Sequence, residues 1–126
     1  MGAQEIPEDL RRFVLTSVPA VPFVEALLVF REAAGVPVTI ELLARRLYMG
    51  EREAAAIVEQ LRAAHIIEPV SGGAGHRYDP APELAEMLEK LVSFYRSHLL
   101  EVTNLIHSRA PRMAHQFADA FRLRKD

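Results

Sequence analysis

The sequence contains five histidines, the residue type best suited to bind a metal ion or to transfer a proton near neutral pH. They stand at positions 65, 76, 98, 107 and 115. A helical metal site needs two ligands at a short spacing such as His-x3-His, and no two of these histidines have it. His98 and Glu101 would share a helix face, but no second pair of this kind accompanies them. We therefore expect neither a metal nor a cofactor.

The sequence also lacks the motifs of nucleophilic catalysis and of phosphate binding. The chain has no cysteine, which excludes disulfides and thiolate metal sites and fits a reducing compartment. No serine lies in a nucleophile elbow, and no paired carboxylates stand out from the charged faces. The glycine-rich segment 71–75 lacks the Lys-Ser/Thr ending of a phosphate loop, and no helix is expected after it. The sequence therefore predicts a protein that is not an enzyme.

Composition limits the remaining classes. The chain has 126 residues, half of them hydrophobic and a quarter charged, as in one globular domain with room for an appended element. Its net charge of −2 gives no general attraction to DNA or to an acidic membrane. No apolar run approaches the ~20 residues of a membrane span, and the N-terminus lacks the apolar run of a signal peptide. We expect a cytoplasmic protein that does not contact a membrane.

The elements can be predicted in chain order from proline, glycine and apolar spacing. An N-terminal arm helix from about Pro7 to Thr16 and a linker occupy 1–21, because the two prolines of SVPAVP keep that connector extended. A helix then starts at Pro22 and ends near Gly35, a favourable C-terminal cap. Its inward face is predicted to carry Phe23, Ala26, Leu27, Phe30 and Ala34.

Two further helices follow, separated by a tight turn. Thr39 is the expected N-cap of the first, whose inward stripe would be Ile40, Leu43, Ala44 and Leu47. Gly50 is expected to take the left-handed conformation in the turn Tyr48-Met49-Gly50. The second helix runs from Glu51 to about Ala64 and should bury Ala54, Ile57, Val58 and Leu61. His65 ends it, because histidine tolerates a left-handed backbone better than most residues.

A hairpin and a long helix complete the predicted order. The β-branched segment 66–70 and the segment 76–79 form two strands, with Pro69 restricted to an edge. The segment 80–110 contains a helix from Ala81 to about Arg109 with no proline or glycine after Pro82. One seam of this helix has spacings of three and four residues. The apolar stripe of this helix can face a second copy of the chain, which is the interpretation that we favour. Alternatively, the helix folds back over the core of its own chain. The seam comprises Leu88, Val92, Tyr95, Leu99, Val102 and Ile106.

The last segment, 111–126, is expected to form a short amphipathic tail helix with a basic end. Phe117 and Phe121 lie one turn apart on it. Because exposed aromatic side chains tend to be covered, we expect the tail to dock on a partner subunit or on the core. The dimer contacts predicted from sequence are therefore the seam of the long helix together with these two phenylalanines.

The stretch from Thr39 to Tyr78 resembles a known superfamily. It contains LLARRL, the YMG turn, AAAIVEQLRAAHII and EPVSGGAGHRYDP in this order. This order is similar to that of the winged helix-turn-helix superfamily of bacterial transcriptional regulators, nearest in layout to the MarR-like, PadR-like and ArsR-like groups. The resemblance covers about 22–79. The helix after the hairpin is similar to the dimerisation helices that several of these groups carry.

The resemblance implies a fold that is mainly α with a small β-hairpin, and a dimeric DNA-binding regulator. The second helix of the pair, 51–64, would enter the major groove, and the hairpin 70–78, the wing, would lie along the DNA backbone. A two-fold dimer would place two such helices about 34 Å apart. The residues implied in DNA contact are Arg45, Arg46, Arg52, Ala56, Gln60, Arg62, His76 and Arg77.

Three glutamates depart from this pattern. Glu51, Glu53 and Glu59 also belong to the outward face of the second helix. Because DNA affinity depends largely on neutralising phosphates, glutamates on that face oppose binding. A second hypothesis therefore stays open, in which the winged helix binds another protein and no DNA, through the acidic helix or the aromatic tail.

Overall fold

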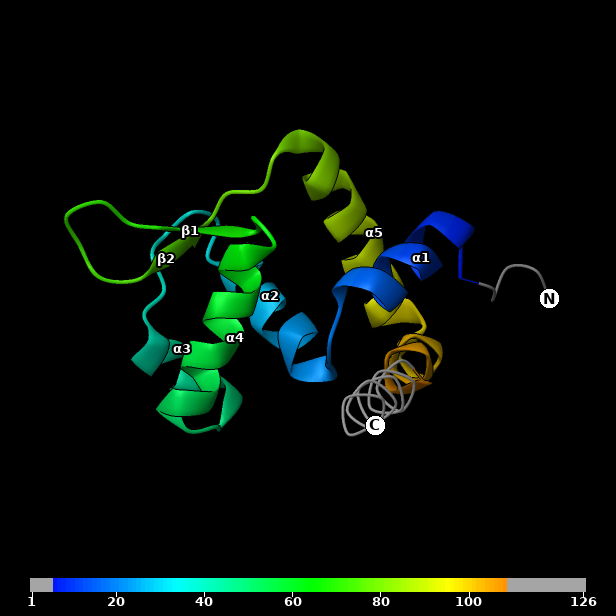
Figure 1. Cartoon of the computed structure of the whole chain (residues 1–126), viewed down its shortest axis with the longest axis horizontal. Helices are drawn as coiled ribbons and strands as arrows, with labels where there is room; N and C mark the ends of the chain where they lie inside the picture. Colours follow the sequence, from blue (N-terminus) through cyan, green and yellow to red (C-terminus); the bar gives the residue numbers. More distant parts are fainter. Residues whose placement is uncertain (1–5, 109–126) are drawn as a thin grey trace, which may run out of the picture. The chain divides into compact units, whose positions relative to one another are not determined.

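The computed structural model describes residues 6–108, which form six helices and one two-stranded antiparallel sheet (Figure 1). The predicted class, mainly helical with a small hairpin, is confirmed. The described residues belong to two compact units, one within Met1–Val21 and Ser93–Asp126, the other Pro22–Val92. The elements are α1 (Glu8–Ser17), α2 (Val21–Glu32), α3 (Ile40–Leu47), α4 (Glu51–Ala63), β1 (Ile67–Pro69), β2 (His76–Tyr78), α5 (Pro82–Ser97) and a final helix over 99–108.

No helix among the described residues has by itself both the length and the apolar composition of a membrane span. The helices α1 and α2, joined by a short break, meet these criteria only when taken together.

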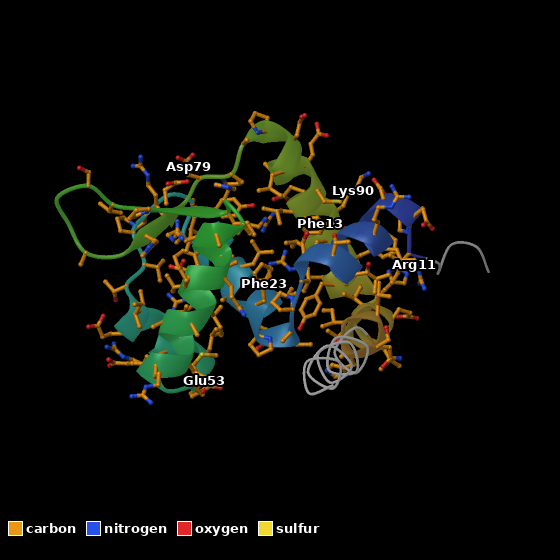
Figure 2. All side chains as sticks on the ribbon, viewed as in Figure 1. Arg11, Phe13, Phe23, Glu53, Asp79 and Lys90 are labelled. Carbon is orange, nitrogen blue, oxygen red and sulfur yellow. The ribbon has the colours of Figure 1, made fainter. Side chains whose placement is uncertain are left out.

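The unit Pro22–Val92 includes nearly all of α2, a helix in which nine of the twelve residues are apolar. Phe23, labelled in Figure 2, is 2% exposed, and Leu27 and Phe30 are fully buried. The predicted inward faces of α3 and α4 supply further core residues, including Leu43, Ala44, Ala54, Ile57, Val58 and Leu61. Burying large apolar side chains contributes about 1.5–3 kcal/mol each. Within this core, α3 packs against α4, and α4 packs against β1.

The end of α2 differs from the prediction. The helix stops at Glu32, and Ala34 is exposed with a φ of 55° instead of facing inward. Gly35 follows with a φ of 91°. Two successive residues with positive φ turn the chain sharply, so Ala34 leaves the helical face before it can join the core.

The turn between α3 and α4 is also corrected. Thr39 caps α3 as predicted, since its side-chain oxygen accepts a hydrogen bond from the Leu42 backbone N–H at 3.1 Å. Gly50, however, is extended at φ −72° and ψ 158°, and Tyr48 takes the left-handed conformation at φ 55° and ψ 48°. The Met49 N–H donates to the Ala44 carbonyl at 3.0 Å, which closes a Schellman-type helix end with Tyr48 at the usual glycine position.

The hairpin has the predicted position and an additional partner. Strands β1 and β2 pair antiparallel, with Ile67 opposite Tyr78 and Pro69 opposite His76. His65 ends α4 with a φ of 64°, as the sequence predicts. Beyond this pair, Val38 and His76 exchange two backbone hydrogen bonds of 2.8 and 3.0 Å. The segment just before α3 is therefore attached to the hairpin, a contact that the sequence analysis missed.

A bidentate ion pair joins α2 to α5 within this unit. Arg31 Nε and Nη2 donate to the two Glu89 carboxylate oxygens at 2.6 and 2.7 Å. The hydrogen bond to Glu89 raises the pKa of Arg31, which keeps the guanidinium charged. The Tyr78 hydroxyl is buried without a hydrogen-bond partner among the described residues. Burial, and next the Glu89 charge, raise the pKa of Tyr78, so the phenol stays neutral.

The predicted single long helix is interrupted at His98. Helix α5 ends at Ser97, and helical structure resumes over 99–108. The Ser97 hydroxyl donates to the Ser93 carbonyl at 2.9 Å, a back-bond that bends helices. It also lies 2.8 Å from His98 Nδ1, and the His98 ring stacks on Phe94 with centroids 4.8 Å apart. These local polar contacts accompany a break in a segment that has no proline or glycine after Pro82.

Burial also changes the reading of the predicted dimer seam. Five of its six side chains are buried within the single chain: Leu88, Val92, Tyr95, Val102 and Ile106. They were assigned to a contact between two copies, but side chains enclosed by their own chain have no area left for a partner. Leu99 alone of the seam is exposed, at 53%. Phe117 and Phe121 lie outside the described residues.

One glycine of the hairpin is required by a close backbone approach. A Cβ on Gly75 would lie 2.8 Å from the Val38 carbonyl oxygen, and its φ is 98°. We predict that Gly75→Ala lowers the free energy of unfolding by about 2–3 kcal/mol, because both strain and collision oppose the folded state. Gly73→Ala is the control, since a Cβ there meets only an ordinary contact at 3.5 Å. Urea unfolding measures both, and equal stabilities would contradict the prediction.

Candidate nucleic-acid interface

Three elements of the unit Pro22–Val92 line a common groove of about 560 Å³. The start of α3, the start of α4 and the end of the hairpin loop all contribute to it. Its lining residues are Thr39, Ile40, Glu41, Glu51, Arg52, Ala55, Ala74, Gly75 and His76. The Val38–His76 backbone pair holds the loop beside α3, and the short turn after α3 brings the first turn of α4 to the same place. The groove is therefore a direct product of the topology.

Two of the sequence-predicted contact residues meet in this groove. Arg52 comes from the first turn of α4 and His76 from the start of β2. Arg52 is exposed, whereas His76 is half-buried because both its backbone polar groups pair with Val38. Their side chains supply one permanent positive charge and one group that can become positive. This is a place where a phosphate could be contacted from two elements.

Three of the other predicted cations do not line this groove and lie on two elements, α3 and β2. Arg45 and Arg46 are exposed on the last turn of α3, and Arg77 is exposed in the middle of β2. Within residues 6–108, none of these three arginines forms an ion pair, and the same holds for Arg52. They are therefore available to an external anion without first breaking an internal contact.

Arg62 differs from the other predicted contact residues. Its Nη2 lies 2.6 Å from Glu59 Oε2, and its Nε donates to Glu59 Oε1 at 3.1 Å. The hydrogen bond from Arg62 lowers the pKa of Glu59, and the His76 charge adds a smaller effect in the same direction. The hydrogen bond from Glu59 in turn raises the pKa of Arg62. A phosphate would have to compete with Glu59 for this guanidinium.

The outward face of α4 is otherwise small or acidic. Ala56 and Gln60 are exposed, as the sequence predicts. Glu51 and Glu53 are exposed in the first turn, where they stabilise the helix through its dipole, and Figure 2 shows Glu53 projecting outward. The groove itself contains Glu41 and Glu51 opposite Arg52. The positive charge of the candidate surface therefore comes from the end of α3 and from β2 as much as from α4.

Tyr48 is absent from the contact residues predicted from sequence, although it is 96% exposed in the turn between α3 and α4. Its position in the YMG turn was noticed, but the left-handed conformation was given to Gly50. The signal that could have found it is the spacing of the turn. Residue 48 directly follows the last helical residue, Leu47, and this is where a left-handed cap belongs.

No group of three potential metal-ligating side chains occurs within the described part of the chain. Comparison with protein-family models, with curated proteins and with solved structures finds no match to this chain. The candidate interface is therefore argued from its geometry and charge.

The Arg62–Glu59 pair makes a pH-dependent prediction. Because the pKa of Glu59 is lowered in the folded chain, the pair stabilises the fold above the ordinary pKa of a glutamate. This contribution is lost as the pH falls through the lowered pKa. We predict that Arg62→Gln moves the pKa of Glu59 upward, as measured by carboxyl carbon NMR during a pH titration. Arg52→Gln is the control and should leave Glu59 unchanged; an unshifted Glu59 in Arg62→Gln would contradict the pair.

Proposed function

We propose that the segment 22–79 is a winged helix-turn-helix and that the protein is a dimeric DNA-binding transcriptional regulator. The observation that carries the proposal is the groove shared by α3, α4 and the hairpin, with unpaired arginines on all three elements. Helix α4 enters the major groove, and the hairpin acts as the wing along the backbone. Arg52 on α4 and Arg77 on β2 then contact DNA phosphates from two different elements.

The order of elements supports this proposal. The segment 22–79 begins with a core helix and an isolated β-bridge residue, Val38. Two helices joined by a tight turn follow, and then a hairpin that pairs back to Val38. In such an arrangement, the second helix of the pair is supported from behind by the first and by the core. Its outward residues Ala56 and Gln60 are small or neutral, so the helix can approach base edges closely.

The charge distribution indicates modest affinity with strong salt dependence. Arg45, Arg46, Arg52 and Arg77 offer four phosphate contacts per subunit, while the exposed glutamates of α4 oppose binding. Four contacts per subunit make eight in the proposed dimer, which corresponds to a slope of about −7 for log K against log salt concentration. Specificity would come from the few neutral residues of α4 and from the fit of the wing.

We predict that the protein retards a DNA fragment from directly upstream of its own gene at low salt and releases it as salt rises. Arg52→Ala and Arg77→Ala should each weaken binding several-fold and reduce the magnitude of the salt slope by about two, because each removes one phosphate contact from both subunits of the dimer. Arg62→Ala is the matched control with a smaller effect, because Glu59 already holds that guanidinium. Fluorescence anisotropy at several salt concentrations measures all four proteins. Absence of binding at low salt with micromolar protein would reject the proposal.

A second candidate function is supported by the acidic face of α4. Glu51, Glu53 and Glu59 are exposed on one helix, which suits a basic protein partner better than it suits DNA. In this alternative the winged helix docks another protein and binds no DNA, through the acidic helix or through the tail predicted from sequence. The DNA experiment separates the two functions, because only the first requires phosphate contacts.

The homodimer is part of the proposal. Its support is the adjacent pair Leu99 and Leu100 on the helix 99–108, which are 53% and 69% exposed. Neighbouring large apolar side chains at a surface are typical of contacts between chains. A two-fold dimer would give the paired recognition helices that a palindromic site needs.

We predict that light scattering gives twice the mass of the single chain at micromolar concentration. The double substitution Leu99→Lys and Leu100→Lys should halve that mass, because charges at the contact are costly to bury. Glu101→Lys is the control and should remain dimeric, because Glu101 is exposed on the same helix but lies about 200° around the axis from Leu99. A monomer mass for the unaltered protein would reject the dimer, and an unaltered mass for the double variant would reject this contact.

A further inference from the structure

Tyr48 combines two features that do not serve the fold. Its side chain is 96% exposed, so it adds almost no apolar burial to the core. Its backbone lies in the left-handed region at φ 55°, which disfavours a residue with a bulky side chain. Glycine is the usual residue at this position of a Schellman-type helix end. A tyrosine at this position therefore costs stability relative to glycine.

The surroundings of Tyr48 are rich in unpaired positive charge. Arg45 and Arg46 precede it on the last turn of α3, and Arg52 follows it on the first turn of α4. None of these three arginines forms an ion pair within residues 6–108. Glu51 and Glu53 lie on the same turn of α4 as Arg52, so the segment 45–53 carries three positive and two negative charges. The excess is positive on a surface that belongs to a net acidic chain.

We propose that Tyr48 contacts the sugar-phosphate backbone of DNA, with its hydroxyl donating to a phosphate and its ring lying against the sugar. Tyrosine is among the side chains that hydrogen-bond DNA phosphates. Tyr48 lies three residues before α4, where a backbone strand would border the major groove that α4 enters. Arg45 and Arg46 neutralise the same strand. This inference rests on the proposed DNA-binding function and adds a contact residue to it.

A polyanion fits the surface formed by the segment 45–53 better than a protein partner does. The three arginines lack internal counter-ions, and a line of phosphates can neutralise all of them at once. Exposed tyrosine and arginine also occur together in protein interfaces. A protein partner, however, would have to desolvate these arginines and offer matched carboxylates to each. The DNA backbone offers its charges without such matching.

The test separates the fold from the contact by comparing two equivalent substitutions. Tyr48→Gly removes the ring and relieves the left-handed strain. Ala34→Gly relieves the same conformation, φ 55°, at an exposed position outside the candidate interface, and is the matched control. Tyr48→Phe keeps the ring and the strain and removes only the hydroxyl. Each protein is melted thermally and titrated into a labelled mixed-sequence duplex of about 30 base pairs at about 50 mM salt.

We expect Tyr48→Gly and Ala34→Gly each to raise Tm by a few degrees. Tyr48→Gly should bind the duplex about tenfold more weakly, because it loses both the hydrogen bond to a charged group and the contact of the ring with the sugar. Tyr48→Phe should weaken binding by a smaller factor without raising Tm, and Ala34→Gly should leave affinity unchanged. A gain in stability accompanied by a loss of affinity at Tyr48 alone would establish the contact.

Two other outcomes overturn the inference in distinguishable ways. If the unaltered protein and Tyr48→Gly bind the duplex equally, Tyr48 does not contact DNA and the proposed function stands. If the unaltered protein does not bind the duplex even at low salt, the proposed function and this contact fall together. In that case the exposed segment 45–53 would be assigned to the second candidate function, contact with a protein partner.

Discussion

The backbone pair between Val38 and His76 is the contact on which the candidate surface depends. Its two hydrogen bonds, of 2.8 and 3.0 Å, tie the segment before α3 to the hairpin that follows α4. The approach is so close that only glycine fits at position 75. The two strands have only three residues each, and isolated hairpins are marginally stable. The contact with Val38 therefore fixes the position of the hairpin beside α3. With it, the start of α3, the start of α4 and the loop form one groove.

Charge within this frame is divided between groups that are already paired and groups that are free. Arg31 forms an ion pair with Glu89 that joins α2 to α5. Arg62 forms an ion pair with Glu59 within α4. The arginines at the end of α3, at the start of α4 and on β2 have no such partner among the described residues. This division leaves Arg45, Arg46, Arg52 and Arg77 without an internal counter-ion among the described residues, although the whole chain has a net charge of −2. The acidic residues of α4 limit the strength of the candidate surface and keep a protein partner as the competing explanation.

The C-terminal helices illustrate how a regular apolar pattern can be used in more than one way. The seam from Leu88 to Ile106 has the spacing of a helix contact, and that spacing is the same for a contact within one chain and a contact between two chains. Five of the six side chains are enclosed by their own chain, and the break at His98 leaves Leu99 exposed beside Leu100. Burial, which spacing cannot report, moves the candidate dimer contact from the whole seam to this short stretch.

The sequence by itself determined the elements whose signals are local. Helix ends at Thr39 and His65, the buried face of α4 and the hairpin of 66–79 follow from capping residues, apolar spacing and β-branched residues, and the structure agrees with each. Only the tertiary structure decided the features that depend on distant or competing contacts. The Val38–His76 pair joins residues far apart in the chain, and the free or paired state of each arginine depends on its neighbours in space. The left-handed residue of the turn is Tyr48 rather than Gly50 because the end of α3 fixes which residue must turn, and this geometric requirement outweighs the intrinsic preference of glycine.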